Sequence, residues 1–190
     1  MKLDRILPFA RKLLESALSP GDMAVDATVG NGHDTLYLAN LVGERGHVFG
    51  FDIQHAAIAQ TNTKLSEQKL LSRVTLFEAS HDKMSEVLPA SVNQRIKAAI
   101  FNLGYLPGGD KGIVTKPDST ISAVEQLLTV MPSEGIIILV VYHGHEEGAY
   151  ERDQLLSYVT TIDQQYAHVL NYRFMNQQNN PPFIIAIEKR

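Results

Sequence analysis

The stretch that decides the fold is DATVGNGHDT, which runs from Asp26 to Thr35. It follows a short apolar segment, Met23–Ala27, that we expect to form a β-strand, and it leads into a helical pattern. Gly30 and Gly32 allow the backbone to turn sharply and to approach a ligand closely. A strand, a glycine-bearing turn and a helix in this order are typical of a nucleotide-binding unit in an α/β sheet.

A second acidic position supports this interpretation. Asp52 lies at the end of the next predicted strand, in FGFDIQ, about 20 residues beyond the turn, as nucleotide-binding units require. A carboxylate at that place can accept two hydrogen bonds from a ribose diol. The turn and Asp52 together therefore predict a ligand that contains a nucleoside.

Two ligands fit the turn. A dinucleotide favours G-x-G-x-x-G, and the position of the third glycine is occupied here by Thr35. S-adenosylmethionine (SAM) favours D-x-G-x-G-x-G, which the chain matches with Asp26, Gly30 and Gly32 but not at Thr28. In this alternative Asp26 lies close to the cationic amino group of the ligand. We favour SAM, and dinucleotide binding remains the alternative.

The rest of the chain repeats the alternation of strand and helix. An amphipathic helix with apolar residues from Leu3 to Leu18 opens the chain, and a continuous apolar run, Ile136–Tyr142, is typical of a strand that is buried on both faces. The other predicted strands are His47–Phe51, Val74–Glu78, Ala98–Asn102, Val169–Met175 and Phe183–Glu188, and the other predicted helices are Asp34–Leu41, Ala56–Gln68, Asp82–Leu88, Ser119–Met131 and Tyr150–Gln165. The connection between the last two strands is too short for a crossover helix, so we expect them to pair antiparallel.

This pattern predicts an α/β fold with a Rossmann-like, doubly wound, mostly parallel sheet of seven strands and a C-terminal antiparallel hairpin. We expect residues 1–190 to form a single domain. The chain contains no cysteine, which excludes a disulfide framework, a thiolate metal site and a cysteine nucleophile. A net charge of −4 does not by itself indicate nucleic-acid binding. The absence of a signal-peptide pattern leads us to expect a cytoplasmic protein.

The candidate catalytic loop is NLGYLPGGDK, Asn102–Lys111, which follows the fourth predicted strand. The side-chain carbonyl of Asn102 can accept an N–H from a substrate amine, and the ring of Tyr105 can stack on a planar base. The loop resembles the N-P-P-Y motif of methyltransferases that act on exocyclic amino groups, with Leu103 and Gly104 in place of the two prolines.

The segments DATVGNGHDT, FDIQ, Ser80-His81, NLGYLPGGDK and IVTKPDST together resemble a small family of Gram-positive bacteria, the "putative rRNA methylases", within the class I SAM-dependent methyltransferases. Members of it act as tRNA 5-(aminomethyl)-2-thiouridine methyltransferases. The resemblance covers essentially the whole chain. It implies methylation of the aminomethyl nitrogen on the wobble uridine of tRNA, with the anticodon stem-loop as the partner. We also keep a homodimer as a candidate assembly.

The resemblance also implies which residues contact the cofactor. Those in the turn and after the second and third strands are Asn31, Gly32, Asp34, Thr35, Asp52, Gln54, Ser80 and His81.

On the substrate side, Lys111 and Lys116 are expected to meet RNA phosphates. Tyr142 and His143, at the end of the fifth predicted strand, are expected to line the base pocket. The pair of His143 and His145 does not predict a metal site, because methyl transfer from a sulfonium needs no metal. The alternatives are methylation of rRNA or of a small-molecule amine, and a non-catalytic dinucleotide-binding module.

Overall fold

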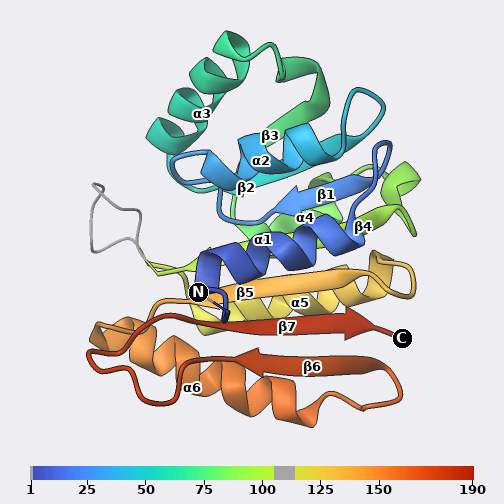
Figure 1. The fold of residues 1–190 in the computed structure, drawn as a ribbon. Coiled ribbons are helices and arrows are strands. Elements are labelled where there is room, and N and C mark those ends of the chain that lie inside the picture. The colour runs from blue at the N-terminus through green and yellow to red at the C-terminus, as the bar shows by residue number, and fades with distance from the viewer. Residues whose placement is uncertain (1, 105–113) are drawn as a thin grey trace.

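The computed structural model describes residues 2–104 and 114–190, and its seven strands form one sheet (Figure 1). The strand order is β3-β2-β1-β4-β5-β7-β6. The strands are β1 (Met23–Asp26), β2 (His47–Asp52), β3 (Val74–Glu78), β4 (Ile96–Leu103), β5 (Ile136–Val141), β6 (Ala167–Tyr172) and β7 (Phe183–Lys189). The first five strands pair in parallel, whereas β7 pairs antiparallel with both β5 and β6.

Helices cover both faces of the sheet, and in Figure 1 α1 lies in front of it and α5 behind it. The α-helices are α1 (Ile6–Ala17), α2 (His33–Leu41), α3 (His55–Glu67), α4 (Met84–Val87), α5 (Pro117–Val130) and α6 (Glu146–Thr161). Three short 3-10 turns are η1 (Leu71–Arg73), η2 (His81–Lys83) and η3 (Ala90–Val92).

The hydrophobic core has one layer on each face because successive side chains of a strand point to opposite sides. Ile100 of β4 belongs to the layer beneath α1 and α2, and its neighbour Phe101 belongs to the layer beneath α5 and α6. Both side chains are fully buried, as expected for a parallel strand with helices on either side. The continuous apolar run of β5 has the same explanation.

The strand order reverses direction between β1 and β4, which lie side by side in parallel. In doubly wound sheets, ligands bind in the crevice at the carboxyl ends of the strands on either side of such a reversal. The turn after Asp26 and the end of β4 at Asn102 and Leu103 are therefore the two segments that border the expected binding crevice.

The predicted fold class is confirmed, including the C-terminal antiparallel hairpin, and the main differences lie at element boundaries. The last helix runs over Glu146–Thr161 instead of the predicted Tyr150–Gln165. It begins earlier because the ring of His145 caps it by accepting a hydrogen bond from the Gly148 N–H at 2.9 Å. Gly148 is a residue that sequence patterns assign to a loop. No helix in the part of the chain that the structure describes is long and apolar enough to cross a membrane.

Candidate active site

Asp26 lies inside the glycine turn, and its side chain is fully buried. One carboxylate oxygen accepts a hydrogen bond from the Thr35 hydroxyl at 2.6 Å, and the other accepts one from the Thr28 N–H at 3.1 Å. Burial, followed by repulsion from Asp34, raises the pKa of Asp26 to about 7. Asp26 therefore stabilises the turn through hydrogen bonds to Thr28 and Thr35. Because its carboxylate is buried, its charge can affect a bound ligand only through the residues of the turn.

Asp52 at the end of β2 also holds the turn. Its carboxylate accepts a hydrogen bond from the Gly30 N–H at 2.8 Å and another from the Gln54 N–H at 2.9 Å. A carboxylate has about four lone-pair positions, so two bonds leave Asp52 able to accept more. The predicted contact with a ribose thus remains compatible with this geometry, and Gln54 lies beside it at the start of α3.

The turn lies directly against α3. Gly32 has φ +76°, and a Cβ atom at this position would meet the Thr61 hydroxyl oxygen at 2.5 Å. The Lys64 ammonium donates to the backbone carbonyl of Asn31 at 2.7 Å. Only glycine combines that backbone conformation with so close a neighbour, which gives Gly32 a packing reason in addition to its predicted role as a ligand contact.

Asn102 and Asp34 form the polar pair at the carboxyl ends of β4 and β1. The Asn102 amide nitrogen donates to a carboxylate oxygen of Asp34 at 2.7 Å, and the Asn102 backbone N–H donates to the Thr28 hydroxyl at 2.7 Å. The first bond orients the amide, because its nitrogen faces Asp34. The side-chain carbonyl of Asn102 has no hydrogen-bond partner among the described residues and is left as an acceptor.

Tyr142 follows β5 and lies near this pair. Partial burial and then the negative charge of Asp34 raise the pKa of the Tyr142 phenol. Its side chain is nevertheless 38% exposed. The predicted contact of the Tyr142 ring with a bound base is compatible with this exposure and stays a prediction.

His143 makes a different set of contacts. Its Nε2 donates to the Pro181 carbonyl at 3.0 Å, and its Nδ1 faces the Arg152 guanidinium at 3.3 Å. Its ring packs edge-on against Phe183. Burial and then Arg152 lower the pKa of His143. These contacts join β5, α6 and β7, and the predicted place of His143 in the base pocket stays a prediction that the geometry does not strengthen.

His81 is the first residue of η2 and forms a wall beside the start of the turn that follows β1. Its Nδ1 donates to the Ala27 carbonyl at 3.0 Å, and its ring packs edge-on against Phe101. Burial lowers the pKa of His81, so Nε2 is a neutral acceptor. This buried Nε2 and the buried Oδ1 of Asp82 have no hydrogen-bond partner among the described residues. Buried polar atoms without partners are costly, and two of them side by side in the chain fit a polar ligand at this wall, next to Ser80.

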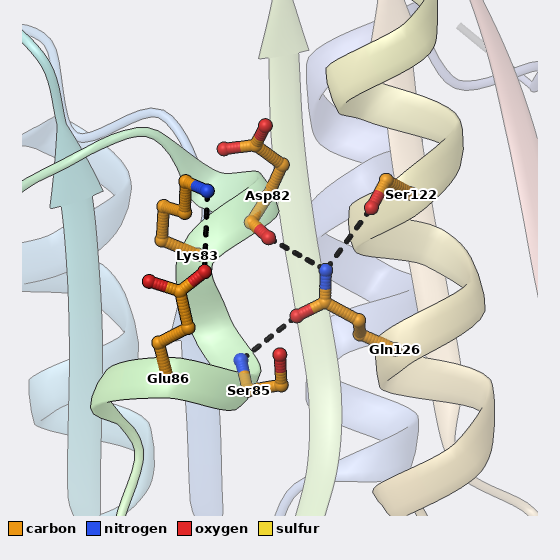
Figure 2. Close-up of polar contacts among 6 residues, drawn as sticks. All are labelled: Asp82, Lys83, Ser85, Glu86, Ser122 and Gln126. Carbon is orange, nitrogen blue, oxygen red and sulfur yellow. Dashed lines mark hydrogen bonds and ion pairs between the residues drawn. The ribbon is translucent and has the colours of Figure 1, made fainter.

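The segment that carries this wall is held by Gln126 of α5 (Figure 2). Its amide nitrogen donates to the Asp82 carbonyl at 2.6 Å and to the Ser122 hydroxyl at 3.1 Å. Its amide oxygen accepts from the Ser85 N–H at 2.8 Å. One side chain thus ties η2 and α4 to α5, and we infer that Gln126 supports the position of His81.

The substrate side is described in part. Tyr105 and Lys111 lie outside the described residues, so their predicted roles stay predictions. Lys116 is exposed and occupies the N-cap position of α5, where its side chain is accessible to RNA. Among the described residues, no group of three or more His, Cys, Asp or Glu side chains could hold a metal ion.

Several residues that shape the site were not predicted from the sequence. Thr28 drew notice only as a departure from the glycine pattern, and its hydroxyl turns out to accept from the Asn102 N–H. Gln126 on α5, and Glu151 on α6, which accepts hydrogen bonds from Thr115 and Thr120, carry no sequence signal. A polar residue in an amphipathic helix is expected to face water. Their roles depend on which elements pack against α5 and α6.

A family model described as "Putative rRNA methylase" matches residues 48–188. The chain belongs to this family. The match covers β2 through β7, and with them Asp52, the His81 wall, Asn102 and Tyr142.

Individual relatives agree with the membership of the rRNA methylase family. The chain is 41% identical over 150 residues to the chloroplastic tRNA (mnm(5)s(2)U34)-methyltransferase of Arabidopsis thaliana, which covers 75% of this chain and 54% of that protein. The chain thus spans about half the length of this curated relative.

Two solved structures share the whole fold. A "putative rRNA-methylase" from Clostridium thermocellum superimposes with a TM-score of 0.96 at 40% identity, over 100% of both chains. A "putative methyltransferase" from Streptococcus mutans, in complex with SAH, superimposes with a TM-score of 0.89 at 34% identity, over 99% of both chains.

Proposed function

We propose that this chain is a SAM-dependent N-methyltransferase that modifies tRNA. The substrate is the aminomethyl nitrogen of 5-aminomethyl-2-thiouridine at the wobble position. The observation that carries the reaction type is the oriented amide of Asn102, whose carbonyl is left to accept an N–H beside the turn. The choice of tRNA is supported by the similarity to the Arabidopsis enzyme.

The turn offers the groups that SAM requires. The second-strand acid Asp52 retains acceptor capacity for a ribose, and the unpartnered Nε2 of His81 and Oδ1 of Asp82 suit a polar nucleobase edge. The carboxylates of Asp26 and Asp34 suit the cationic part of the ligand. Support for SAM also comes from the related S. mutans protein, which is in complex with SAH. The predicted contacts of Asn31, Thr35, Gln54 and Ser80 belong to the same proposal.

When bound, SAM supplies an activated methyl group for in-line transfer to a nucleophile. The protein residues orient the acceptor and exclude water. The Asn102 carbonyl accepts one N–H of the neutral substrate amine and directs its lone pair toward the methyl group. Asp34 keeps the Asn102 amide in that orientation. Correct orientation of two reactants is itself a large part of catalysis. Tyr142, with Tyr105, stacks on the uracil ring.

RNA binding is proposed to use Lys111 and Lys116 as phosphate contacts. An exposed lysine contributes through the release of counterions from the phosphate backbone. The anticodon stem-loop as the bound portion, the homodimer and the cytoplasmic location remain predictions.

Ribosomal RNA is the second candidate substrate, because the family model is described as an rRNA methylase. The Asn102 carbonyl would orient an exocyclic amine of a base in the same way as it orients an aminomethyl group. Both candidates share one chemistry and differ only in the RNA that brings the amine to the crevice.

The test is methyl transfer with labelled SAM and three RNA pools. The first is tRNA whose wobble uridine carries the aminomethyl group, the second is tRNA that lacks this group, and the third is unmodified small-subunit rRNA. Nucleosides are then separated and weighed by mass spectrometry. We expect one added methyl group on 5-aminomethyl-2-thiouridine in the first pool alone. Transfer to rRNA alone would favour the second candidate, and binding of NAD(H) without any transfer would favour the dinucleotide-binding module.

A further inference from the structure

Glu151 is a buried carboxylate that the proposed chemistry leaves unused. It lies on α6, and its side chain is 2% exposed. Burial raises the pKa of Glu151, while hydrogen bonds from Thr115 and Thr120 and the nearby His145 lower it. A carboxylate is costly to bury unless its oxygens are satisfied, so its partners indicate its role.

Each oxygen of Glu151 accepts a hydrogen bond from a threonine hydroxyl. Thr115 donates to Oε2 at 2.5 Å, and Thr120, on α5, donates to Oε1 at 2.8 Å. Two hydrogen bonds, one in each direction, join Thr115 to Gly104. The Gly104 N–H donates to the Thr115 hydroxyl at 2.9 Å, and the Thr115 N–H donates to the Gly104 carbonyl at 3.1 Å.

The direction of these bonds depends on the charge of Glu151. A hydroxyl group has one proton to donate and can accept in addition. Thr115 donates its proton to Glu151, so its oxygen is free to accept from the Gly104 N–H. The result is a series of hydrogen bonds that all run in one direction, from Gly104 through Thr115 to Glu151. Chains of this kind polarise and strengthen their members.

Gly104 is the point at which the chain leaves β4, two residues after Asn102. Its φ of +141° is a conformation that other residues rarely adopt, and a Cβ atom there would meet the Cβ of Tyr142 at 3.4 Å. The Tyr142 N–H also donates to the Leu103 carbonyl at 3.2 Å. Gly104 therefore lies two residues after Asn102 and beside Tyr142, the two described residues that the proposed function places against the substrate.

We propose that Glu151 is a positioning residue for the methyl acceptor. Through Thr115 it holds Gly104, and thereby the exit of β4, so that Asn102 and Tyr142 keep their relative positions. The inference rests on the proposed function for its activity readout. A role in stability alone would not need the charge, because apolar residues of similar volume often replace a buried charged group without loss of stability.

The test uses Glu151→Gln, which keeps the shape of the side chain. Thr115 and Thr120 donate to different oxygens of Glu151. In glutamine one of these two positions becomes an NH2 donor, so both threonines cannot keep donating to it. We expect single-turnover methyl transfer to tRNA to fall about tenfold or more, because small misalignments of reacting groups are costly. SAH affinity should stay within about twofold, since misplaced acceptor groups affect the reacting state rather than cofactor binding.

Three further variants distinguish the proposed role from a folding defect. Thr115→Val removes the hydroxyl and should reproduce the loss of rate, whereas Thr115→Ser keeps the hydroxyl and should restore most of it. Tyr166→Phe is the matched control, because it removes one partly buried hydrogen bond, to the Leu128 carbonyl at 3.0 Å, at the end of the sheet opposite the exit of β4. We expect Tyr166→Phe to leave the rate unchanged at a comparable loss of stability.

Amide hydrogen exchange gives a readout that does not depend on the substrate. Glu151→Gln and Thr115→Val should speed exchange at the Gly104 and Thr115 amides, and Tyr166→Phe should not. A wild-type rate in folded Glu151→Gln, an SAH affinity that falls in step with the rate, or unchanged exchange at both amides would each overturn the proposal. If the wild-type protein does not methylate tRNA, the proposed function fails, and the exchange data alone decide whether Glu151 controls Gly104.

Discussion

The protonation of Asp26 should be coupled to SAM binding. The pKa of Asp26 is raised to about 7 from the ordinary value of 3.8 for an aspartate, first by burial and second by repulsion from Asp34. A bound cation acts in the opposite sense, because it favours the ionised carboxylate. SAM carries two positive charges, on its sulfonium and amino groups, and one negative charge, on its own carboxylate. Its binding in the turn should therefore lower the pKa of Asp26 and release a proton.

The size of the effect follows from the raised pKa. At about pH 8 the carboxylate is already mostly ionised, whereas at about pH 6 it must lose its proton for SAM to bind tightly. The apparent affinity should then be about tenfold weaker at pH 6 than at pH 8, which corresponds to a difference of ~1.4 kcal/mol in the free energy of binding. The dependence should level off above a pH of about 7.

The same shift has a consequence for the ligand-free protein. Because the folded-state pKa lies above the unfolded value, the protonated form of Asp26 stabilises the fold. This contribution is complete below a pH of about 3.8 and is lost as the pH rises to about 7. In urea unfolding, the free energy of unfolding of the wild type should therefore fall relative to that of Asp26→Asn as the pH rises across this interval, because asparagine does not ionise.

Calorimetric titration of SAM at several pH values, each in two buffers of different ionisation enthalpy, measures both the affinity and the proton count. Asp26→Asn is the control, because asparagine cannot ionise and should bind with little dependence on pH. An affinity that is flat between about pH 6 and 8, with no buffer dependence of the heat, would refute the coupling, since the raised pKa requires a change of about one decade over this range.

Three further predictions test other parts of the site. Asn102→Ala should slow single-turnover methyl transfer about a hundredfold with SAH affinity unchanged, because orientation acts in the transition state; a near-normal rate at saturating tRNA would contradict its role. Lys116→Ala should reduce the slope of log affinity for tRNA against log salt by about 0.7–0.9, and filter binding that returns the wild-type slope would exclude this lysine. Gly32→Ala should lower the free energy of unfolding in urea by ~1 kcal/mol or more beyond Gly21→Ala. Both glycines have positive φ, but only at Gly32 does a Cβ meet Thr61, at 2.5 Å; equal losses would contradict this reasoning.

The fold class was predictable because the features that determine it are local in the sequence. The glycines between Met23–Ala27 and the next helix, the apolar run of β5 and the short connection before β7 each reflect the backbone of a few residues. Helix ends were less predictable. The start of α6 depends on His145 acting as a cap for Gly148, and a cap of this kind has no periodic signal.

The sequence singled out residues for the candidate site, but it did not indicate which of their atoms pair. The motif singled out Asp34 and Asn102 separately, whereas the bond of 2.7 Å between them joins segments 68 residues apart. The bond from the Asn102 N–H to Thr28 likewise requires β4 to lie beside β1. The family resemblance indicated the chemistry without indicating that Asp34 orients the amide.

By itself, the sequence determined the alternation of strands and helices, the ligand-binding turn and the positions of its acids, since these depend on backbone preferences over short distances. Only the tertiary structure decided that Asp26 is buried, that Asp52 holds Gly30 and that Glu151 reaches Gly104 through Thr115. Those contacts depend on strand order and register, which bring distant residues within hydrogen-bond distance. The burial and the charge state of these side chains depend on the residues packed around them, and a sequence pattern does not show which residues those are.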